Sequence, residues 1–122
     1  MAEEKRFENR VKKFLREQGC YYVKYWGGGT YTKSGVPDLL VSVNGYFLGI
    51  ELKATNGKPS PLQLYHLGAV RRSGGTGILL YPRDWEKFTD FIISIVSYGY
   101  SPQTLLRSGD YPFLKRWWSY DL

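Results

Sequence analysis

The chain has 122 residues, of which 43% are apolar, and this is enough for one compact domain but too little for two. Its 17 lysines and arginines outnumber its 11 acidic residues, and the resulting net charge of +6 favours acidic partners. The longest apolar runs fall far short of the ~20 residues of a membrane span, and the charged N-terminus lacks the apolar core of a secretory signal. We therefore expect a cytoplasmic protein with no membrane partner.

The composition also limits which metal site the chain can build. It contains a single cysteine, Cys20, and a single histidine. These two residues cannot supply the four ligands of a structural zinc site, and one cysteine cannot form an internal disulfide. Any bound metal should therefore be a hard cation held by oxygen atoms, in a reducing compartment.

An amphipathic helix is the first predicted element. Apolar residues recur at i, i+4, i+7 and i+8 between residues 3 and 18, and Gly19 ends the pattern. Residues 20–26 are rich in Tyr and Val and predict a strand. This strand runs into a glycine-rich loop over residues 27–35, where we expect backbone mobility to be concentrated.

A β-hairpin over residues 38–53 is the clearest local pattern. The dipeptide Asn44-Gly45 is typical of a two-residue type I′ turn, which makes the numbers of opposed residues add up to 89. Asp38 then lies opposite Glu51, and the period of two places Lys53 on the same face. The opposite face of the hairpin is almost entirely apolar and should pack against helices.

The rest of the chain predicts a helix, a strand and a further helix. Residues 60–63, Ser-Pro-Leu-Gln, supply an N-cap, a proline at the first helical position and a capping-box glutamine, so a helix should follow and end near residues 73–75. A buried strand is predicted over residues 76–81, and Asp84 should then cap another helix. The predicted order is α, β, β, β, α, β, α, and residues 98–122 show no clear period.

The charged end of the hairpin has the residue types of a metal-dependent hydrolytic site. Two carboxylates roughly 5 Å apart repel each other, and a divalent cation between them would remove that conflict. Mg²⁺ or Mn²⁺ held in this way completes its shell with phosphate oxygens, which suits phosphodiester hydrolysis. Lys53 could stabilise negative charge or position the attacking water. The alternative is an ordinary cluster of charges on a solvated sheet face.

Two further residues remain open to more than one interpretation. Glu8 flanks the apolar stripe of the first helix, and it joins the hairpin charges only if this helix crosses the charged end. Otherwise it is a solvated glutamate that pairs with Lys12. Gln63 either contributes to the site or serves only in the capping box.

The chain resembles the PD-(D/E)xK nuclease superfamily, and more narrowly its VRR-NUC branch of virus-type replication-repair nucleases, which is similar to archaeal Holliday junction resolvases. Four segments between about residue 3 and residue 96 carry the resemblance: FENRVKKFLREQG with Glu8, GVPDLLV at 35–41, IELKAT at 50–55 and SPLQ at 60–63.

The resemblance implies an α/β fold with a restriction-endonuclease-like αβββαβ core and a mixed central sheet flanked by helices, and we expect a C-terminal helix and tail to follow. It implies a nuclease domain over residues 1–97. Residues 98–122 lie beyond the resemblance, and we expect them to form an aromatic and basic C-terminal extension, packed on the same domain or on a dimer partner.

The resemblance further implies a Mg²⁺- or Mn²⁺-dependent endodeoxyribonuclease that acts on branched DNA such as a four-way junction, as a homodimer with two active sites. The catalytic residues carried over are Glu8, Asp38, Glu51, Lys53 and Gln63. The implied metal ligands are Glu8, Asp38, Glu51 and the backbone carbonyl of Leu52. A less structure-selective nicking, flap or restriction-like nuclease is the first alternative, and a non-catalytic DNA-binding module is the second.

Basic residues near these motifs are expected to hold the phosphate backbone. Segment 27–35 either lies along a DNA strand or is a flexible connector, and it is not a P-loop because the required glycine before Lys33 is absent. Arg71 and Arg72 are further basic candidates. The tail aromatics could stack on unpaired bases, bury a subunit contact or pack on their own domain. The expected DNA-binding residues are Lys24, Lys33, Ser34 and Lys58.

Overall fold

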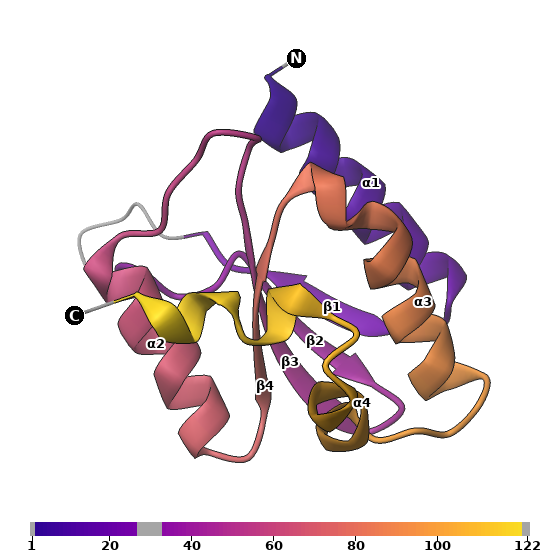
Figure 1. Ribbon diagram of the computed structural model, residues 1–122. Coiled ribbons are helices and arrows are strands. Elements are labelled where there is room, and N and C mark those ends of the chain that lie inside the picture. The colour runs from indigo at the N-terminus through magenta and orange to yellow at the C-terminus, as the bar shows by residue number, and fades with distance from the viewer. Residues whose placement is uncertain (1, 27–32, 121–122) are drawn as a thin grey trace.

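A mixed four-stranded sheet is the centre of the computed structural model, which describes residues 2–26 and 33–120 (Figure 1). The strand order is β1-β2-β3-β4; the first two pairings are antiparallel and the pairing of β3 with β4 is parallel. The predicted α/β class, the αβββαβ core and the mixed sheet flanked by helices are confirmed.

The described residues form helices and strands close to the predicted bounds, and none of these helices is long and apolar enough to cross a membrane. The helices are α1 (Glu3–Glu17), α2 (Pro61–Arg72), α3 (Trp85–Val96) and α4 (Pro102–Ser108). The strands are β1 (Tyr21–Lys24), β2 (Leu39–Val43), β3 (Tyr46–Leu52) and β4 (Thr76–Leu80). Short 3-10 helices follow at η1 (Pro82–Asp84), η2 (Pro112–Leu114) and η3 (Arg116–Ser119).

The helices cover both faces of the sheet, as Figure 1 shows, with α1 and α3 on one side and α2 on the other. The larger core packs the apolar face of the hairpin against α1 and α3, as predicted; its hairpin members are Leu39, Val41, Val43, Leu48, Ile50 and Leu52. The smaller core lies under α2 and contains Leu64, Leu67, Leu79, Tyr81 and Trp117.

The register of the hairpin is the predicted one. Val43 pairs with Tyr46 and Leu39 pairs with Ile50, so opposed residue numbers add up to 89. Asn44 has a φ of 51° and Gly45 a φ of 86°, the two positive values that a type I′ turn requires. The turn therefore places Asp38, which directly precedes β2, at the same end of the hairpin as Glu51.

The predicted capping box of α2 is present, whereas the predicted cap of α3 is wrong. Ser60 Oγ accepts a hydrogen bond from Gln63 N at 3.2 Å, and Gln63 Oε1 accepts one from Ser60 N at 2.9 Å. Asp84 precedes α3 but makes no side-chain bond to its first turn. Its carboxylate instead accepts from Tyr81 N at 2.8 Å and from both Arg116 nitrogens at 2.7 Å, because this arginine reaches it from the tail.

The C-terminal segment that contains η2 and η3 wraps around β4, the edge strand of the sheet. Phe113 is fully buried in the larger core, with its ring against Phe88 and Phe91 of α3. Trp117 lies in the smaller core on the opposite face, and its indole N–H donates to the carbonyl of Gly77 at 2.9 Å. The segment thus covers an edge that would otherwise offer unpaired backbone groups.

We predict that the tail contributes substantially to the stability of the fold. Phe113→Ala should lower the free energy of unfolding by about 3–5 kcal/mol, because it leaves a cavity in a closely packed core. Tyr98→Ala, at a residue that is 74% exposed, should change this free energy by less than about 0.5 kcal/mol. Urea denaturation followed by circular dichroism measures both, and similar values for the two variants would show that the tail is dispensable.

Candidate active site

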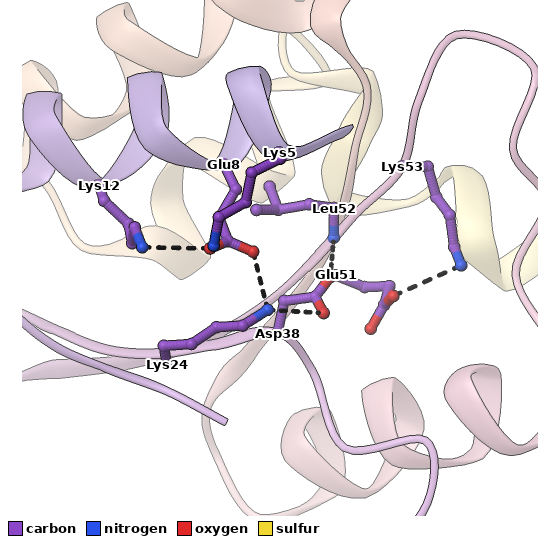
Figure 2. A network of polar contacts seen from close by, with 8 residues as sticks. All are labelled: Lys5, Glu8, Lys12, Lys24, Asp38, Glu51, Leu52 and Lys53. Carbon is purple, nitrogen blue, oxygen red and sulfur yellow. Dashed lines mark hydrogen bonds and ion pairs between the residues drawn. The ribbon is translucent and has the colours of Figure 1, made fainter. Parts of the chain in front are cut away.

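The charged end of the hairpin is where α1, β1 and β3 meet, as the close-up in Figure 2 shows. Asp38 is held there by two backbone contacts. Its Oδ2 accepts from Leu52 N at 2.9 Å, and its own carbonyl accepts from Tyr25 N at 2.9 Å. The backbone of β3 therefore orients the carboxylate, and the bond from Tyr25 holds the backbone of Asp38 in place.

Glu51 is a buried acidic side chain whose surroundings disfavour its charged form. It is only 2% exposed, and its Oε1 is buried without a hydrogen-bond partner. Burial first, and then the nearby charge of Asp38, raise the pKa of Glu51 to about 8, although Lys53 opposes them. The Nζ of Lys53 lies 3.5 Å from Glu51 Oε2, so this lysine is on the predicted face.

Glu8, unlike Glu51, lies in surroundings that favour its charged form. It lies on α1, is 5% exposed, and accepts hydrogen bonds from Lys5 and Lys12 at 3.1 Å each and from Lys24 at 2.8 Å. Burial alone raises the pKa of Glu8, but the bonds from these lysines outweigh it and lower the pKa to about 2. Glu8 therefore reaches the charged end of the hairpin, and the alternative of a solvated glutamate is wrong, although the pairing with Lys12 is present.

Lys24 connects the helix to the hairpin. Its ammonium lies 2.8 Å from Glu8 Oε1 and 3.5 Å from Asp38 Oδ1 (Figure 2). Burial lowers the pKa of Lys24, but the two carboxylates raise it by more, so the pKa stays above its usual value. We expected Lys24 to contact DNA, yet in this arrangement its charge is already paired inside the site.

The carboxylates fit a hard divalent cation in part. Asp38 and Glu51 lie close together, and the unpartnered buried oxygen of Glu51 is the feature that a cation would satisfy. Over residues 2–26 and 33–120, however, no three His, Cys, Asp or Glu side chains are grouped around a common point. The ammonium of Lys24 separates Glu8 from Asp38. A third carboxylate ligand therefore requires this lysine to move.

The other residues expected at the site lie outside the polar network drawn in Figure 2. Gln63 uses its amide oxygen in the cap of α2. Lys33 and Ser34 are exposed just ahead of β2, and Lys58 is exposed between β3 and α2. The glycine-rich part of the expected DNA-binding loop, residues 27–32, lies outside the described residues.

Two contacts at this end were missed from the sequence. Lys5 stands three residues before Glu8 on α1, a helical spacing that could have identified it as a partner. Glu3 accepts from the backbone N–H of Thr55 at 2.8 Å and from its hydroxyl at 2.6 Å. These residues are far apart in the chain, so no local pattern indicates their contact, which ties the start of α1 to the segment after β3.

The two buried glutamates should respond in opposite directions to replacement by glutamine. Glu51→Gln should raise the Tm of the metal-free protein at neutral pH by about 3–6 °C, roughly 1–2 kcal/mol, because the raised pKa of Glu51 makes proton uptake a cost of folding at this pH, and an amide has no such cost. Glu8→Gln should lower the Tm by at least about 3 °C, because it leaves its lysines without their partner.

Asp110→Asn, at an exposed position of the tail outside any helix, is the control for this pair and should leave the Tm unchanged. Differential scanning calorimetry in EDTA measures all three variants. A lower Tm for Glu51→Gln would mean that the buried carboxylate is compensated in the folded protein, and would contradict our interpretation.

Comparisons with solved structures agree with this fold. Among solved structures, one described as a VRR_NUC domain is 24% identical to the chain with a TM-score of 0.59, and the match covers 82% of this chain and 100% of that one. Hjc of Archaeoglobus fulgidus, a Holliday junction resolvase from an archaeal hyperthermophile, is 24% identical with a TM-score of 0.49, covering 65% of this chain and 69% of that one. No curated protein matches the sequence.

A family model assigns the chain to a protein family, which the similar folds alone do not. The model that describes the archaeal Holliday junction resolvase, Hjc, matches residues 2–66, just over half of the chain. This range contains Glu8 on α1, both strands of the hairpin and the start of α2. The chain therefore belongs to the archaeal Holliday junction resolvase family and is a resolvase-like nuclease.

Proposed function

We propose that the chain is a divalent-metal-dependent endodeoxyribonuclease that hydrolyses phosphodiester bonds in branched DNA, with four-way junctions as its preferred substrate. The observation that carries the metal dependence is the buried, unpartnered oxygen of Glu51 beside Asp38. Burying such a group opposes folding unless something compensates it. Cation binding supplies that compensation, and both carboxylates would then bind the same ion.

The proposed ligands of Mg²⁺ or Mn²⁺ are Glu8, Asp38, Glu51 and the backbone carbonyl of Leu52. When bound there, such an ion would lower the pKa of a water molecule and neutralise charge on the scissile phosphate. Lys53 points its ammonium toward Glu51 at 3.5 Å, so it can orient the attacking water or stabilise the phosphate oxygens. Gln63 acts through the cap that holds the start of α2 in place.

The proposed DNA contacts are Lys24, Lys33, Ser34 and Lys58. Three of these residues are exposed, whereas Lys24 is mostly buried between Glu8 and Asp38. Lys24 can therefore donate to a phosphate only after it leaves these carboxylates. Its charge thus balances the carboxylates in the free protein and the phosphate backbone in the complex.

A homodimer would provide the two active sites that symmetric cleavage of a junction needs. We propose this assembly together with a DNA-associated, cytoplasmic location. In this proposal residues 1–97 carry the catalytic groups and residues 98–122 form an extension of the same chain. The burial of Phe113 and Trp117 against the nuclease fold supports an extension that folds with it.

Cleavage of defined DNA substrates tests the proposed activity. The wild-type protein should cut four-way junctions in Mg²⁺ or Mn²⁺ and should be inactive in EDTA. Asp38→Asn should lower the cleavage rate by at least about a thousandfold, because the ion that activates the attacking water loses a ligand whose position the protein fixes. Asp110→Asn, at an exposed position of the tail, is the matched control and should cut at the wild-type rate.

The same assay separates the alternatives by substrate shape. Flap, single-stranded and linear duplex DNA are compared with the junction at equal concentration. Equal cutting of junction and linear duplex would contradict the preference for junctions and identify a less selective nuclease. No metal-dependent cutting of any substrate would contradict the enzymatic proposal and favour a DNA-binding module.

The position of Lys24 yields a prediction on metal affinity that does not depend on cleavage. Lys24→Gln should bind Mn²⁺ about tenfold more tightly, because it removes a positive charge that lies 3.5 Å from Asp38 Oδ1, a proposed ligand atom. In EDTA the same variant should melt at a lower temperature, since Glu8 and Asp38 lose their shared cation.

Thermal shift titrations with Mn²⁺ measure both effects, and Lys87→Gln on α3 controls for net charge. Weaker Mn²⁺ binding by Lys24→Gln than by Lys87→Gln would mean that Lys24 organises the ligands rather than competing with the ion.

A further inference from the structure

A groove lies on the α2 face of the molecule, where this helix meets the C-terminal tail. Two adjoining cavities of about 340 and 370 Å³ form it, and they share Arg71, Arg72 and Trp117. The side chains that matter below line one or both cavities: Tyr65, Arg71, Arg72, Arg107, Trp118 and Tyr120. None of them belongs to the proposed catalytic site.

The lining of this groove is positively charged and aromatic. Arg71, Arg72 and Arg107 contribute three guanidinium groups, while no carboxylate among residues 2–26 and 33–120 lines either cavity. Arg71 and Arg72 are exposed, so their charges are available to a ligand. A concave surface of one charge sign attracts the opposite charge, and phosphate suits the planar donors of arginine.

The aromatic rings are placed to hold flat groups beside these charges. The guanidinium of Arg71 stacks on Trp118 at 3.8 Å from the ring centroid, and that of Arg72 lies 5.8 Å from the ring of Tyr65. Tyr65 is 53% exposed and Trp118 is 38% exposed, so both rings present surface to solvent. Folding does not require such exposure of large aromatic rings, whereas base stacking does.

A glycine on α2 makes room for one of the arginines. A Cβ atom at Gly68 would lie 2.9 Å from Arg72 Nη1, so a side chain there would displace the guanidinium. Arg72 can therefore lie along the helix surface and line both cavities.

We propose that this groove binds a single-stranded segment of DNA, with phosphates on Arg71, Arg72 and Arg107 and bases stacked on Tyr65, Trp118 and Tyr120. A single strand fits better than a duplex, because only unpaired bases can stack on side chains. The proposal rests on DNA being the substrate. The groove begins at Leu64 and Tyr65, directly after Gln63 on α2, so the helix that carries Gln63 also carries the start of this second site.

Binding of a fluorescent oligothymidylate in EDTA tests the groove without cleavage. Trp118→Ala should weaken binding by about tenfold, and Trp118→Phe should restore most of the affinity because it keeps a stacking face. Tyr98→Ala removes an exposed aromatic ring elsewhere and should bind like the wild type. Equal affinities of Trp118→Ala and Tyr98→Ala would overturn the proposal.

The salt dependence of the same binding tests the arginines. Arg72→Ala should reduce the slope of log affinity against log salt by about 0.7, the value for one lost phosphate contact on a single strand. Lys87→Ala removes an exposed charge from α3 on the other side of the sheet and should leave the slope unchanged. An unchanged slope in Arg72→Ala would show that no phosphate lies there.

Photocross-linking locates the strand on the surface. An oligonucleotide that carries iododeoxyuridine should cross-link to Tyr65, Trp118 or Tyr120, identified by mass spectrometry. Cross-links confined to the region of Lys24 and Lys58 would overturn the proposal. It would also be overturned if Trp118→Ala changed the oligomeric mass in light scattering but not the binding of the oligonucleotide. Because these measurements need no metal, absence of junction cleavage by the wild type would contradict the proposed activity and leave this result intact.

Discussion

Burial of Glu51 beside Asp38 is the constraint on which the rest of the site depends. The type I′ turn fixes the register of the hairpin, and the register leaves Glu51 on the face that α2 covers. Among residues 2–26 and 33–120, its buried Oε1 has no hydrogen-bond partner, while Lys53 lies 3.5 Å from its Oε2. The proposed site for a divalent ion would explain why the fold keeps a buried carboxyl that lowers its stability, since catalytic sites retain such groups.

The charges around this pair balance one another in the absence of metal. Glu8 takes hydrogen bonds from three lysines, and one of these, Lys24, is shared with Asp38. The helix is therefore attached to the hairpin through a cation rather than through apolar contact alone. Because a lysine side chain is long and can turn toward solvent, this attachment can be released locally while α1 stays packed through its apolar stripe.

The sequence predicted the parts of the structure that depend on local geometry. The amphipathic stripe of α1, the Asn44-Gly45 turn and the Ser60 to Gln63 cap each involve neighbouring residues, and each is present. The sequence did not reveal contacts between distant residues, such as Glu3 with Thr55. Asp84 shows the same limit, since its expected local role as a helix cap is lost to Arg116, which lies 32 residues away.

The C-terminal tail contributes residues both to the core of the fold and to the proposed second site. Phe113 and Trp117 anchor the segment on the two faces of the sheet, and Trp118 is the next residue after the second anchor. Its ring is therefore held at the surface by a neighbour whose indole is bonded to β4. A stacking residue that is positioned by the core loses little conformational entropy when a base binds, so the groove gains affinity from the same packing that covers the edge strand.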